Sequence, residues 1–373
     1  MTDVIKIAQE LLRKPSVTPH DNGAIDYLAE FLKQNGFATH ILEFSEPNKA
    51  PIKNLYAKKG SGSPHLAFAG HTDVVPVGNE ADWQVPPFSA EIIDGEVIAR
   101  GAVDMKGAIA AFVAAALKAD ISHGTISFII TGDEEAEAVN GTIKLMKWIA
   151  DHGDVIDDCI IGEPTTPNKL GEIIKIGSRG SANFHLTVSG IQGHVAYPQD
   201  NPITKLVNIL HDLKTTNFDS GDDKFQPTNL EPVDLEVGND TVNLIPARAI
   251  AKFNVRYNNH YTPETLKNKV EEICKNHTHD FVLKMEIGAH LYFVEPNKFT
   301  DLISKACKEI TGITPELTAR GATSDARFIK DYCTVVEFGL PQGLAHQVNE
   351  RVAIVDLQTL EKIYNQIIVN YFG

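Results

Sequence analysis

Short, mainly apolar segments recur along the chain, and acidic or imidazole side chains follow each of them. The segments are His65–Ala69, Thr125–Thr131, Asp158–Gly162 and Thr334–Phe338. Runs of this length and composition are typical of strands that are buried on both faces. Helical patterns, such as those over 106–119 and 142–151, alternate with them. This alternation predicts an α/β fold built as a layer sandwich.

The pattern differs in the middle of the chain, between residues 177 and 294. Half-exposed strand patterns and helical patterns are mixed there, over 182–190, 201–213, 233–238, 250–257 and 263–276. The strand–helix alternation resumes after Pro296 and ends in a helix over 356–371. We therefore predict two domains. An α/β domain comprises residues 1–176 and 295–373, and an α+β domain of residues 177–294 is inserted into it.

The first part of the chain predicts two helices, over 3–14 and 23–35, and Asn22 is expected to cap the second. The first helix carries charges throughout and lacks the apolar core of a secretion signal. None of the four cysteines belongs to a C-x-x-C pair, which favours a reducing compartment. We therefore expect a cytoplasmic protein.

The charge balance excludes some classes of partner. The chain has 34 basic and 49 acidic residues and a formal net charge of −15. This acidic excess argues against nucleic-acid binding and against binding to an anionic membrane. The longest uncharged apolar run, Gly107–Leu117, is too short to span a membrane. An anionic substrate would need local arginines.

Five motifs carry the candidate site residues, and each of them follows a predicted strand. They are Ala69–Asp73, Ala99–Gly107, Thr131–Glu135, Ile160–Pro164 and Gly343–Glu350. Open α/β sheets bind ligands beyond the C-terminal ends of their strands, so we expect the motifs to meet there. Their candidate metal ligands are His71, Asp104, Glu134 or Glu135, Glu163 and His346.

Each motif also has a simpler explanation when it is taken alone. Asp73 is placed to orient the second ring nitrogen of a metal-binding His71, but a capping aspartate beside a loop histidine gives the same pattern. Asp104 stands where a helix N-cap stands. The three acids at 133–135 repel one another unless cations neutralise them, whereas a solvated loop would also carry them. The coincidence of five such motifs favours the metal site.

Imidazoles and carboxylates together suit zinc. They divide evenly between two ions, with a histidine and a carboxylate for each ion and one carboxylate shared. Two divalent ions would then be balanced by three ligand carboxylates and a bridging hydroxide. One further acid would serve as the general base. The spacing does not decide whether Glu134 or Glu135 has that role.

These residues resemble the zinc aminoacylase/carboxypeptidase family, which includes acetylornithine deacetylases and amino-acid desuccinylases. The resemblance spans essentially the whole chain. It rests on Phe68–Pro76, Pro86–Gly95, Asp104–Gly107, Asp133–Glu135, Gly162–Pro164, Ser178–Ser181, Gly190–Pro198, Asn243–Pro246, Phe253–Tyr257, Thr323–Asp325 and His346–Glu350. Pro86–Gly95 and Gly190–Pro198 point to the desuccinylases. The resemblance implies a three-layer zinc-hydrolase catalytic domain with an inserted α+β domain that serves as lid and dimerisation domain.

The resemblance also implies the division of the ligands. His71 and Glu163 would hold one zinc ion, Glu135 and His346 would hold the other, and Asp104 would bridge the two. Cobalt would be able to replace zinc.

The family's pattern assigns the remaining roles at the site. Glu134 would be the general base, and Asp73 would support His71. A cis peptide is implied between Asp104 and Met105. His194 of the inserted domain would act in the active site of the partner subunit, so the resemblance implies a homodimer.

The implied reaction is hydrolysis of the amide of N-succinyl-LL-2,6-diaminopimelate to succinate and LL-diaminopimelate. Arg179 and Arg256 offer planar forks for the carboxylates of this anionic N-acyl amino acid, although lid arginines also pair with surface acids. The predicted neutral hydrogen-bonding partners of the substrate are Ser181, Asn243 and Thr323.

The sequence departs from the family's pattern at three positions. Ser178 stands where desuccinylases usually have an arginine, and Ala322 and Ala326 replace glycines of a substrate-contacting loop. These changes bear on acyl specificity and not on the metal chemistry. The alternatives are a sister hydrolase, such as an acetylornithine deacetylase or a dipeptidase, and a non-catalytic zinc-dependent binding protein. The complete ligand set with Glu134 argues against the last.

Overall fold

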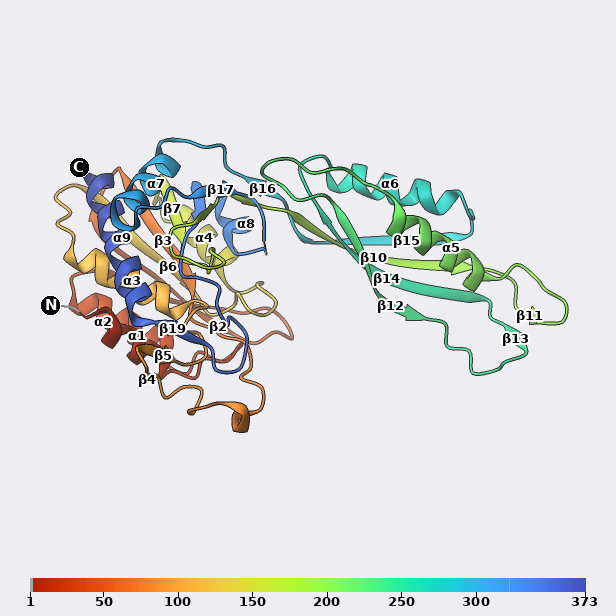
Figure 1. The fold of residues 1–373 in the computed structure, drawn as a ribbon, viewed down its shortest axis with the longest axis horizontal. Coiled ribbons are helices and arrows are strands. Elements are labelled where there is room, and N and C mark those ends of the chain that lie inside the picture. The colour runs from red at the N-terminus through yellow and green to blue at the C-terminus, as the bar shows by residue number, and fades with distance from the viewer. Residues whose placement is uncertain (1–2, 322) are drawn as a thin grey trace. The chain divides into compact units, whose positions relative to one another are not determined.

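The computed structural model describes residues 3–321 and 323–373. Its internal contacts divide the chain into two units, which are described separately (Figure 1). Unit 1 comprises residues 3–176, 294–318 and 324–373, and unit 2 comprises residues 177–293, 319–321 and 323. The chain first crosses between Ile176 and Gly177, where the predicted boundary lies, and returns one residue before the predicted position. The second visit to unit 2, at 319–323, was not predicted.

Unit 1 is built around an eight-stranded sheet. In spatial order its strands are β1 (Ala38–Phe44), β2 (Ile52–Ser61), β6 (Gly124–Thr131), β3 (His65–His71), β7 (Asp158–Ile161), β18 (Thr334–Glu337), β8 (Ile173–Lys175) and β17 (Glu316–Thr318). The four central strands, β6, β3, β7 and β18, run parallel. Their C-terminal ends therefore lie along one edge of the sheet.

Helices complete the layers of unit 1, as predicted. One group of helices packs together, namely α1 (Val4–Leu12), α3 (Lys106–Lys118), α7 (Lys298–Thr311) and α9 (Ile354–Phe372). The others are α2 (Ala24–Gln34), which packs on β1 and β2, and the mutually packed α4 (Thr142–Asp151) and α8 (Ala326–Ile329). A small sheet, β19 (Arg351–Ala353), β5 (Glu96–Ile98) and β4 (Glu91–Ile93), and a 3-10 turn at Glu80–Asp82 lie outside the main sheet.

The core of unit 1 lies between β3, β6 and the helices α3 and α9. Every residue of β3 and β6 is buried, as their apolar sequences predict. The rings of Phe68 and Phe112 stack with centroids 4.4 Å apart, and Tyr364 packs edge-on against both. Such aromatic pairs prefer stacked or edge-to-face geometry. This rigid core supports the strand ends that carry the candidate site.

Unit 2 has a four-stranded antiparallel sheet. Its strands, in order, are β12 (Asn229–Glu236), β14 (Arg248–Tyr257), β10 (Gly180–Ser189) and β15 (Phe281–Ala289), and its helices are α5 (Pro202–Thr215) and α6 (Pro263–Lys275). Alternate residues of β14 and β10 are buried against these helices, which gives unit 2 its own core. Two short ribbons pair β11 (Gly193–His194) with β13 (Leu244–Ile245), and β9 (Gly177–Ser178) with β16 (Tyr292–Phe293).

Most predicted elements are confirmed, and helix 142–151 has the predicted bounds. The pattern analysis missed β2, β15 and α7. The predicted N-cap residue of α2, Asn22, was also wrong. Gly23 is the N-cap residue, and the Asp21 carboxylate accepts from the backbone N–H groups of Gly23 and Ile25. Asn22 instead donates to the Pro15 carbonyl. Nowhere in 3–321 or 323–373 does a helix have the length and apolar character that crossing a membrane requires.

Candidate metal centre

The predicted metal ligands of unit 1 lie beyond the ends of its central strands. His71 is the last residue of β3, Glu134 and Glu135 follow β6, and Glu163 follows β7. His346 lies in the loop that leads from β18 toward β19. Because the four strands are parallel neighbours, residues far apart in the sequence meet at one edge.

Asp104 reaches this edge by a different route. The sequence analysis expected its motif to follow a strand, and it does, but this strand belongs to the small three-stranded sheet and not to the main sheet. Asp104 follows β5 of the small three-stranded sheet and lies two residues before α3. The peptide between Asp104 and Met105 is cis, as the resemblance implies.

The Asp104 carboxylate lies between the two imidazoles. Its Oδ1 is 3.1 Å from Nε2 of His71, and its Oδ2 is 3.1 Å from Nε2 of His346. Glu163 Oε1 lies 3.7 Å from the same nitrogen of His71, and Glu135 Oε1 lies 2.9 Å from that of His346. The five side chains thus form two ligand groups that share one carboxylate.

The spacing of these atoms fits metal ligation. Nitrogen and oxygen ligands at about 2.0–2.1 Å from a tetrahedral zinc ion lie about 3.3 Å from one another. The observed separations of 2.9–3.7 Å lie on both sides of that value. Ligand atoms of His71, Asp104 and Glu135, and likewise of His71, Glu134 and Glu163, all lie within 4.8 Å of one another. The donor set contains imidazole and carboxylate groups, which zinc accepts.

Burial makes the carboxylates difficult to keep charged. It raises the pKa of Glu163 well above its usual value, and Asp104 adds to the rise. Burial also opposes ionisation of Asp104, but hydrogen bonds from His346 and His71 hold its pKa well below the usual range. Hydrogen bonds to Asp104 and Glu135 raise the pKa of His346 to about 10. Bound cations would take the place of these imidazole protons, because a ligating imidazole is neutral.

The second nitrogen of His71 is oriented by Asp73, mainly through its backbone. Nδ1 of His71 lies 2.8 Å from the Asp73 backbone oxygen and 3.7 Å from its carboxylate, which the sequence analysis expected as the partner. The buried carboxylate instead accepts from the N–H groups of Glu134, at 3.2 Å and 3.3 Å, and of Glu135, at 3.0 Å. Asp73 therefore connects His71 to the two adjacent acids.

Glu134 is an acid of the cluster that belongs to neither of the two ligand groups described above. Burial raises its pKa to about 8, His71 opposes the rise, and Asp325 contributes to it. Bound divalent cations would lower this pKa again. Without bound cations, burial therefore gives this carboxylate a higher affinity for a proton than an exposed glutamate has.

Four buried residues near the site were given no role by the sequence analysis, namely Lys175, Ser324, Asp325 and Glu337. Glu337, at the end of β18, accepts from Lys175 Nζ at 2.7 Å and from Ser324 Oγ at 2.6 Å. Glu337 and Asp325 are 1% and 5% exposed. The Thr323–Asp325 motif signalled this loop, but a single acid at the end of an apolar strand gave no sign that it would bind the loop. Ala322 lies outside the described residues.

Four predicted substrate residues lie together in unit 2. Ser181 and Arg256 are directly paired across β10 and β14, and Arg256 Nη1 lies 3.5 Å from Thr323 Oγ1. Burial and the neighbouring Arg256 lower the pKa of Arg179. Arg179 donates at 2.8 Å to Pro227 and Asn229, so part of its fork is occupied within the chain.

The other two predicted residues of unit 2 lie on the ribbon of β11 and β13. His194 is exposed and pairs with Leu244, and its Nδ1 accepts from Ala196 N–H at 3.1 Å. The backbone oxygen of Asn243 accepts from Val195. Within unit 2, this ribbon is separate from the pair formed by Ser181 and Arg256.

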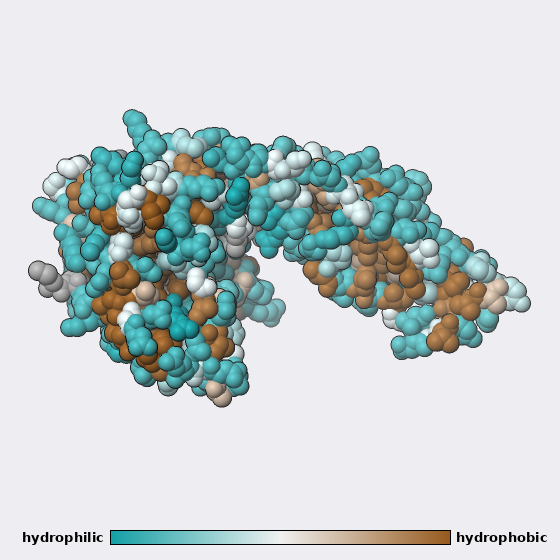
Figure 2. Space-filling view, in the orientation of Figure 1, coloured by the Kyte–Doolittle hydropathy of each residue, from teal (hydrophilic) through white to brown (hydrophobic). Residues whose placement is uncertain are grey.

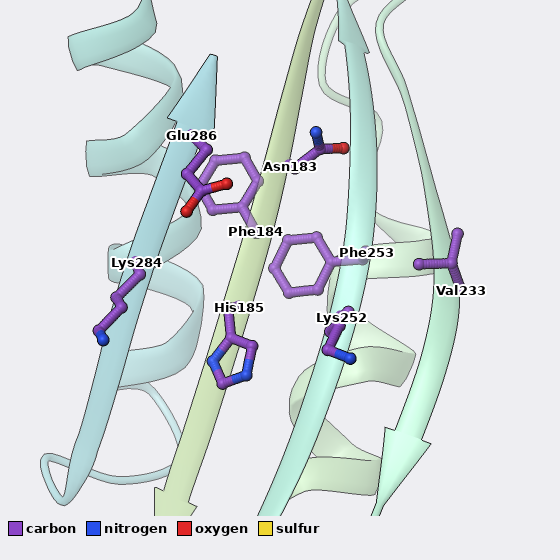
Figure 3. Close-up of a pocket in the computed structure, with 8 residues that line it drawn as sticks. All are labelled: Asn183, Phe184, His185, Val233, Lys252, Phe253, Lys284 and Glu286. Atoms are coloured by element: carbon purple, nitrogen blue, oxygen red, sulfur yellow. The ribbon is translucent and has the colours of Figure 1, made fainter. Parts of the chain in front are cut away.

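The open face of the unit 2 sheet also carries a hollow of about 420 Å³ (Figure 3). A row of His185 with Lys252 and Lys284 on either side crosses three strands there. Lys252 is paired with Asp234 at 2.8 Å. None of the predicted site residues lines this hollow.

The fold agrees with comparisons to known proteins. The sequence profile of peptidase family M20/M25/M40 matches residues 67–370, and the chain belongs to this family. A structure titled as a dinuclear metal-binding peptidase of family M20, from Bacillus subtilis, superposes with a TM-score of 0.69. It is 14% identical and covers 98% of this chain and 97% of its own. An aminopeptidase PepT from Bacillus cereus has a TM-score of 0.78 at 19% identity, covering 99% and 98%.

The more similar relatives carry one name. A protein of Beijerinckia indica is 49% identical over 99% of this chain and 98% of its own length. A protein of Bradyrhizobium sp. strain ORS 278 is 48% identical over the full length of both. Both are named succinyl-diaminopimelate desuccinylase.

The Asp73→Asn variant tests whether the Asp73 carboxylate holds Glu134 and Glu135 in position. The amide keeps one acceptor oxygen but places an NH₂ group against the N–H groups of Glu134 and Glu135. We expect zinc affinity to fall by about 10–100-fold, as is typical when a group that orients a ligand is lost. Titration of the metal-stripped protein with zinc against a chelating dye measures this.

Asp157→Asn is the matched control. Its carboxylate accepts from the N–H of His65 and the hydroxyl of Ser63, at the opposite end of β3. Its zinc affinity should equal that of the wild type. Equal affinity in Asp73→Asn would show that this carboxylate does not position the ligands.

Proposed function

We propose that the chain hydrolyses the amide of N-succinyl-LL-2,6-diaminopimelate to succinate and LL-diaminopimelate, as a step of diaminopimelate and lysine biosynthesis. The observation that carries the proposal is the Asp104 carboxylate between His71 and His346, with Glu134 beside it. Relatives of 48–49% identity with the name succinyl-diaminopimelate desuccinylase support the substrate. Two zinc ions are the proposed metals, and cobalt would replace them.

The ligand residues would divide between two ions. His71 and Glu163 would hold one ion, Glu135 and His346 the other, and Asp104 both; the distances between these side chains support this division. Bound metal ions would polarise the amide carbonyl and make the attacking water more acidic.

Glu134 would act as the general base. Its carboxylate takes a proton from the water that attacks the amide carbon, and then delivers it to the nitrogen of the leaving amine. Its buried surroundings support this cycle, since they raise its affinity for the proton between the two steps. Asp73 keeps the backbone of this residue in place and acts as a positioning residue.

The substrate's carboxylates would be bound by unit 2. Arg179 and Arg256 are close enough to repel each other, and an anionic group between or beside them would relieve this repulsion. Ser181 and Thr323 lie next to Arg256 and would add neutral hydrogen bonds, with Asn243 as a further partner. Ser178 and Ala326 are buried, which favours an indirect effect on the shape of the site.

We also propose a cytoplasmic homodimer. All four cysteines are free thiols, which supports a reducing compartment. The edge strand β12 carries exposed Val233 and Leu235, 67% and 61% exposed, and apolar surface is visible on unit 2 in Figure 2. Unpaired apolar edge strands are suited to association with a second copy.

A sister hydrolase with a different acyl group remains the second candidate, because the metal ligands are common to the family while acyl specificity depends on the residues of unit 2. Of the described departures from the family's pattern, Ser178 lies in unit 2 and Ala326 lies in unit 1. A non-catalytic binding protein is disfavoured by Glu134, which metal binding does not require.

An assay on matched substrates tests the reaction and its metal dependence. The metal-stripped protein should be inactive, and zinc or cobalt should restore turnover. Succinylated diaminopimelate should exceed its acetylated analogue by about 10²-fold or more in kcat/KM, because the acetyl group leaves an arginine fork without its carboxylate. Higher activity on acetylornithine would favour the sister hydrolase, and activity in exhaustively metal-free protein would overturn the mechanism.

Glu134→Gln separates metal binding from proton transfer. The amide preserves the shape of the side chain but accepts no proton, so turnover should fall by at least about 10²-fold. Metal analysis of the same sample should still find two ions per chain. Turnover close to that of the wild type would assign the base to another residue.

His194 tests the homodimer. We expect His194→Ala to lower kcat by about 10²–10³-fold, as loss of one donor to a developing oxyanion does. Mixing this variant with Glu134→Gln should restore activity, because one site of the heterodimer then has both residues. Each variant taken alone through the same mixing is the control. Demonstrated subunit exchange without recovered activity would contradict action across the interface.

A further inference from the structure

The last residue of the His346–Glu350 motif is a fully buried acid that the proposed mechanism does not use. The Glu350 side chain is 0% exposed, and every hydrogen bond that it accepts comes from the segment before α3. Its Oε1 accepts from the N–H groups of Val103, at 2.9 Å, and Asp104, at 3.2 Å. Its Oε2 accepts from Gly101 N–H at 3.0 Å and from Arg100 Nη1 at 2.8 Å. A single carboxylate therefore holds the backbone that carries the shared ligand.

Arg100 connects the same acid to the second histidine. Its side chain is 2% exposed and forms a buried ion pair with Glu350. Its guanidinium donates to the backbone oxygens of Gln347, at 3.1 Å, and His346, at 3.4 Å. It also donates to Pro76, at 3.3 Å. The five donors of a guanidinium allow such simultaneous contacts, and a lysine cannot reproduce them.

The loop that these contacts hold has an unusual backbone. His346 and Asn349 have φ angles of +63° and +61°, a region that residues other than glycine rarely adopt. Such residues persist where the surrounding structure determines their conformation, and they cluster at functional sites. Here the carbonyl of His346 is bound by Arg100, and Asn349 accepts from Gln84 N–H at 2.6 Å.

We propose that the Glu350–Arg100 ion pair is the device that positions the shared carboxylate and His346 relative to each other, and thereby sets the metal affinity of the site. This inference rests on the ligand set of the proposed function. Glu350 acts on Asp104 through its backbone N–H, and Arg100 acts on His346 through its backbone oxygen. The hydrogen bonds described above join the pair to backbone atoms of His346 and Asp104, so it is a positioning element and not part of the ligand set.

The proposal predicts an unequal effect on the two metal positions. Asp104 belongs to both ligand groups, whereas His346 belongs to one, and His71 is oriented independently by Asp73. Loss of the pair should therefore weaken the position of His346 and Glu135 more than that of His71 and Glu163. A purely structural ion pair would lower thermal stability without this asymmetry.

The test measures zinc binding without turnover. Wild type, Glu350→Gln and Arg100→Lys are stripped of metal, and each is titrated with Zn²⁺ alone against a chelator of known affinity. In Glu350→Gln, an NH₂ group replaces one acceptor oxygen and faces backbone N–H donors. We expect one of the two binding steps to lose about 10–100-fold in affinity and the other step to lose less. Arg100→Lys should show the same asymmetry, and it decides the question if Glu350→Gln does not fold.

Glu361→Gln is the matched control. Glu361 is a buried acid of the same unit, 6% exposed, and it pairs with Lys118 on α3. It should lose thermal stability but keep both zinc affinities. If Glu350→Gln and Arg100→Lys also keep both affinities, the proposal is overturned. If the wild type itself binds no zinc, the proposed function fails instead, and the two failures are thereby distinguished.

Discussion

The carboxylate of Asp104, held 3.1 Å from each of two imidazoles, is the contact on which the rest of the site depends. Burying carboxylates close together is costly unless opposite charges neutralise them. Two histidines cannot balance Asp73, Asp104 and the three glutamates of the ligand cluster. Divalent cations can, and the separations of the ligand atoms match the spacing that such ions require. The same electrostatic argument explains why the site lies at the ends of parallel strands, where several acids from distant parts of the chain can converge on one pair of ions.

The packing beneath the site makes this convergence possible. Helix α3 contains six alanines and one glycine and is buried along most of its length. A Cβ atom at Gly107 would lie 2.3 Å from the Ala102 carbonyl, and one at Gly162 would lie 2.6 Å from the Phe68 ring. Both glycines therefore permit close approaches that a larger residue would prevent. Gly107 lets α3 begin directly after Asp104, and Gly162 lets β7 deliver Glu163 to the edge. The small residues of the core thus determine how closely the ligands can meet.

Local patterns predicted the elements that are apolar on all sides, and they failed where burial comes from distant partners. β3 and β6 are recognisable because each is mainly apolar. β2 contains lysines, and its buried residues are covered by α2 and neighbouring strands, which the local pattern does not reveal. The ligands were recognisable because their motifs follow apolar strands, and the resemblance then assigned their roles. Glu350 and Arg100 were not assigned any role, because the two residues are separated by 250 positions in the sequence. A residue that acts through a backbone contact leaves no pattern of its own.

The candidate sites of the two units carry charges of opposite sign. In unit 1 a cluster of acids requires cations, and in unit 2 two neighbouring arginines favour an anion. The net charge of −15 makes such a local cationic pair effective only if surface acids do not neutralise it. The hydrogen-bond partners of Arg179 described above are a backbone carbonyl and an asparagine, which carry no charge, and Asp219 is the acid that acts on it electrostatically. Ser178, next to it, is fully buried, and its hydroxyl has no hydrogen-bond partner in the described part of the chain. A third guanidinium there would have to be desolvated beside two others, so serine at this position limits the repulsion around the two arginines that we propose as carboxylate partners.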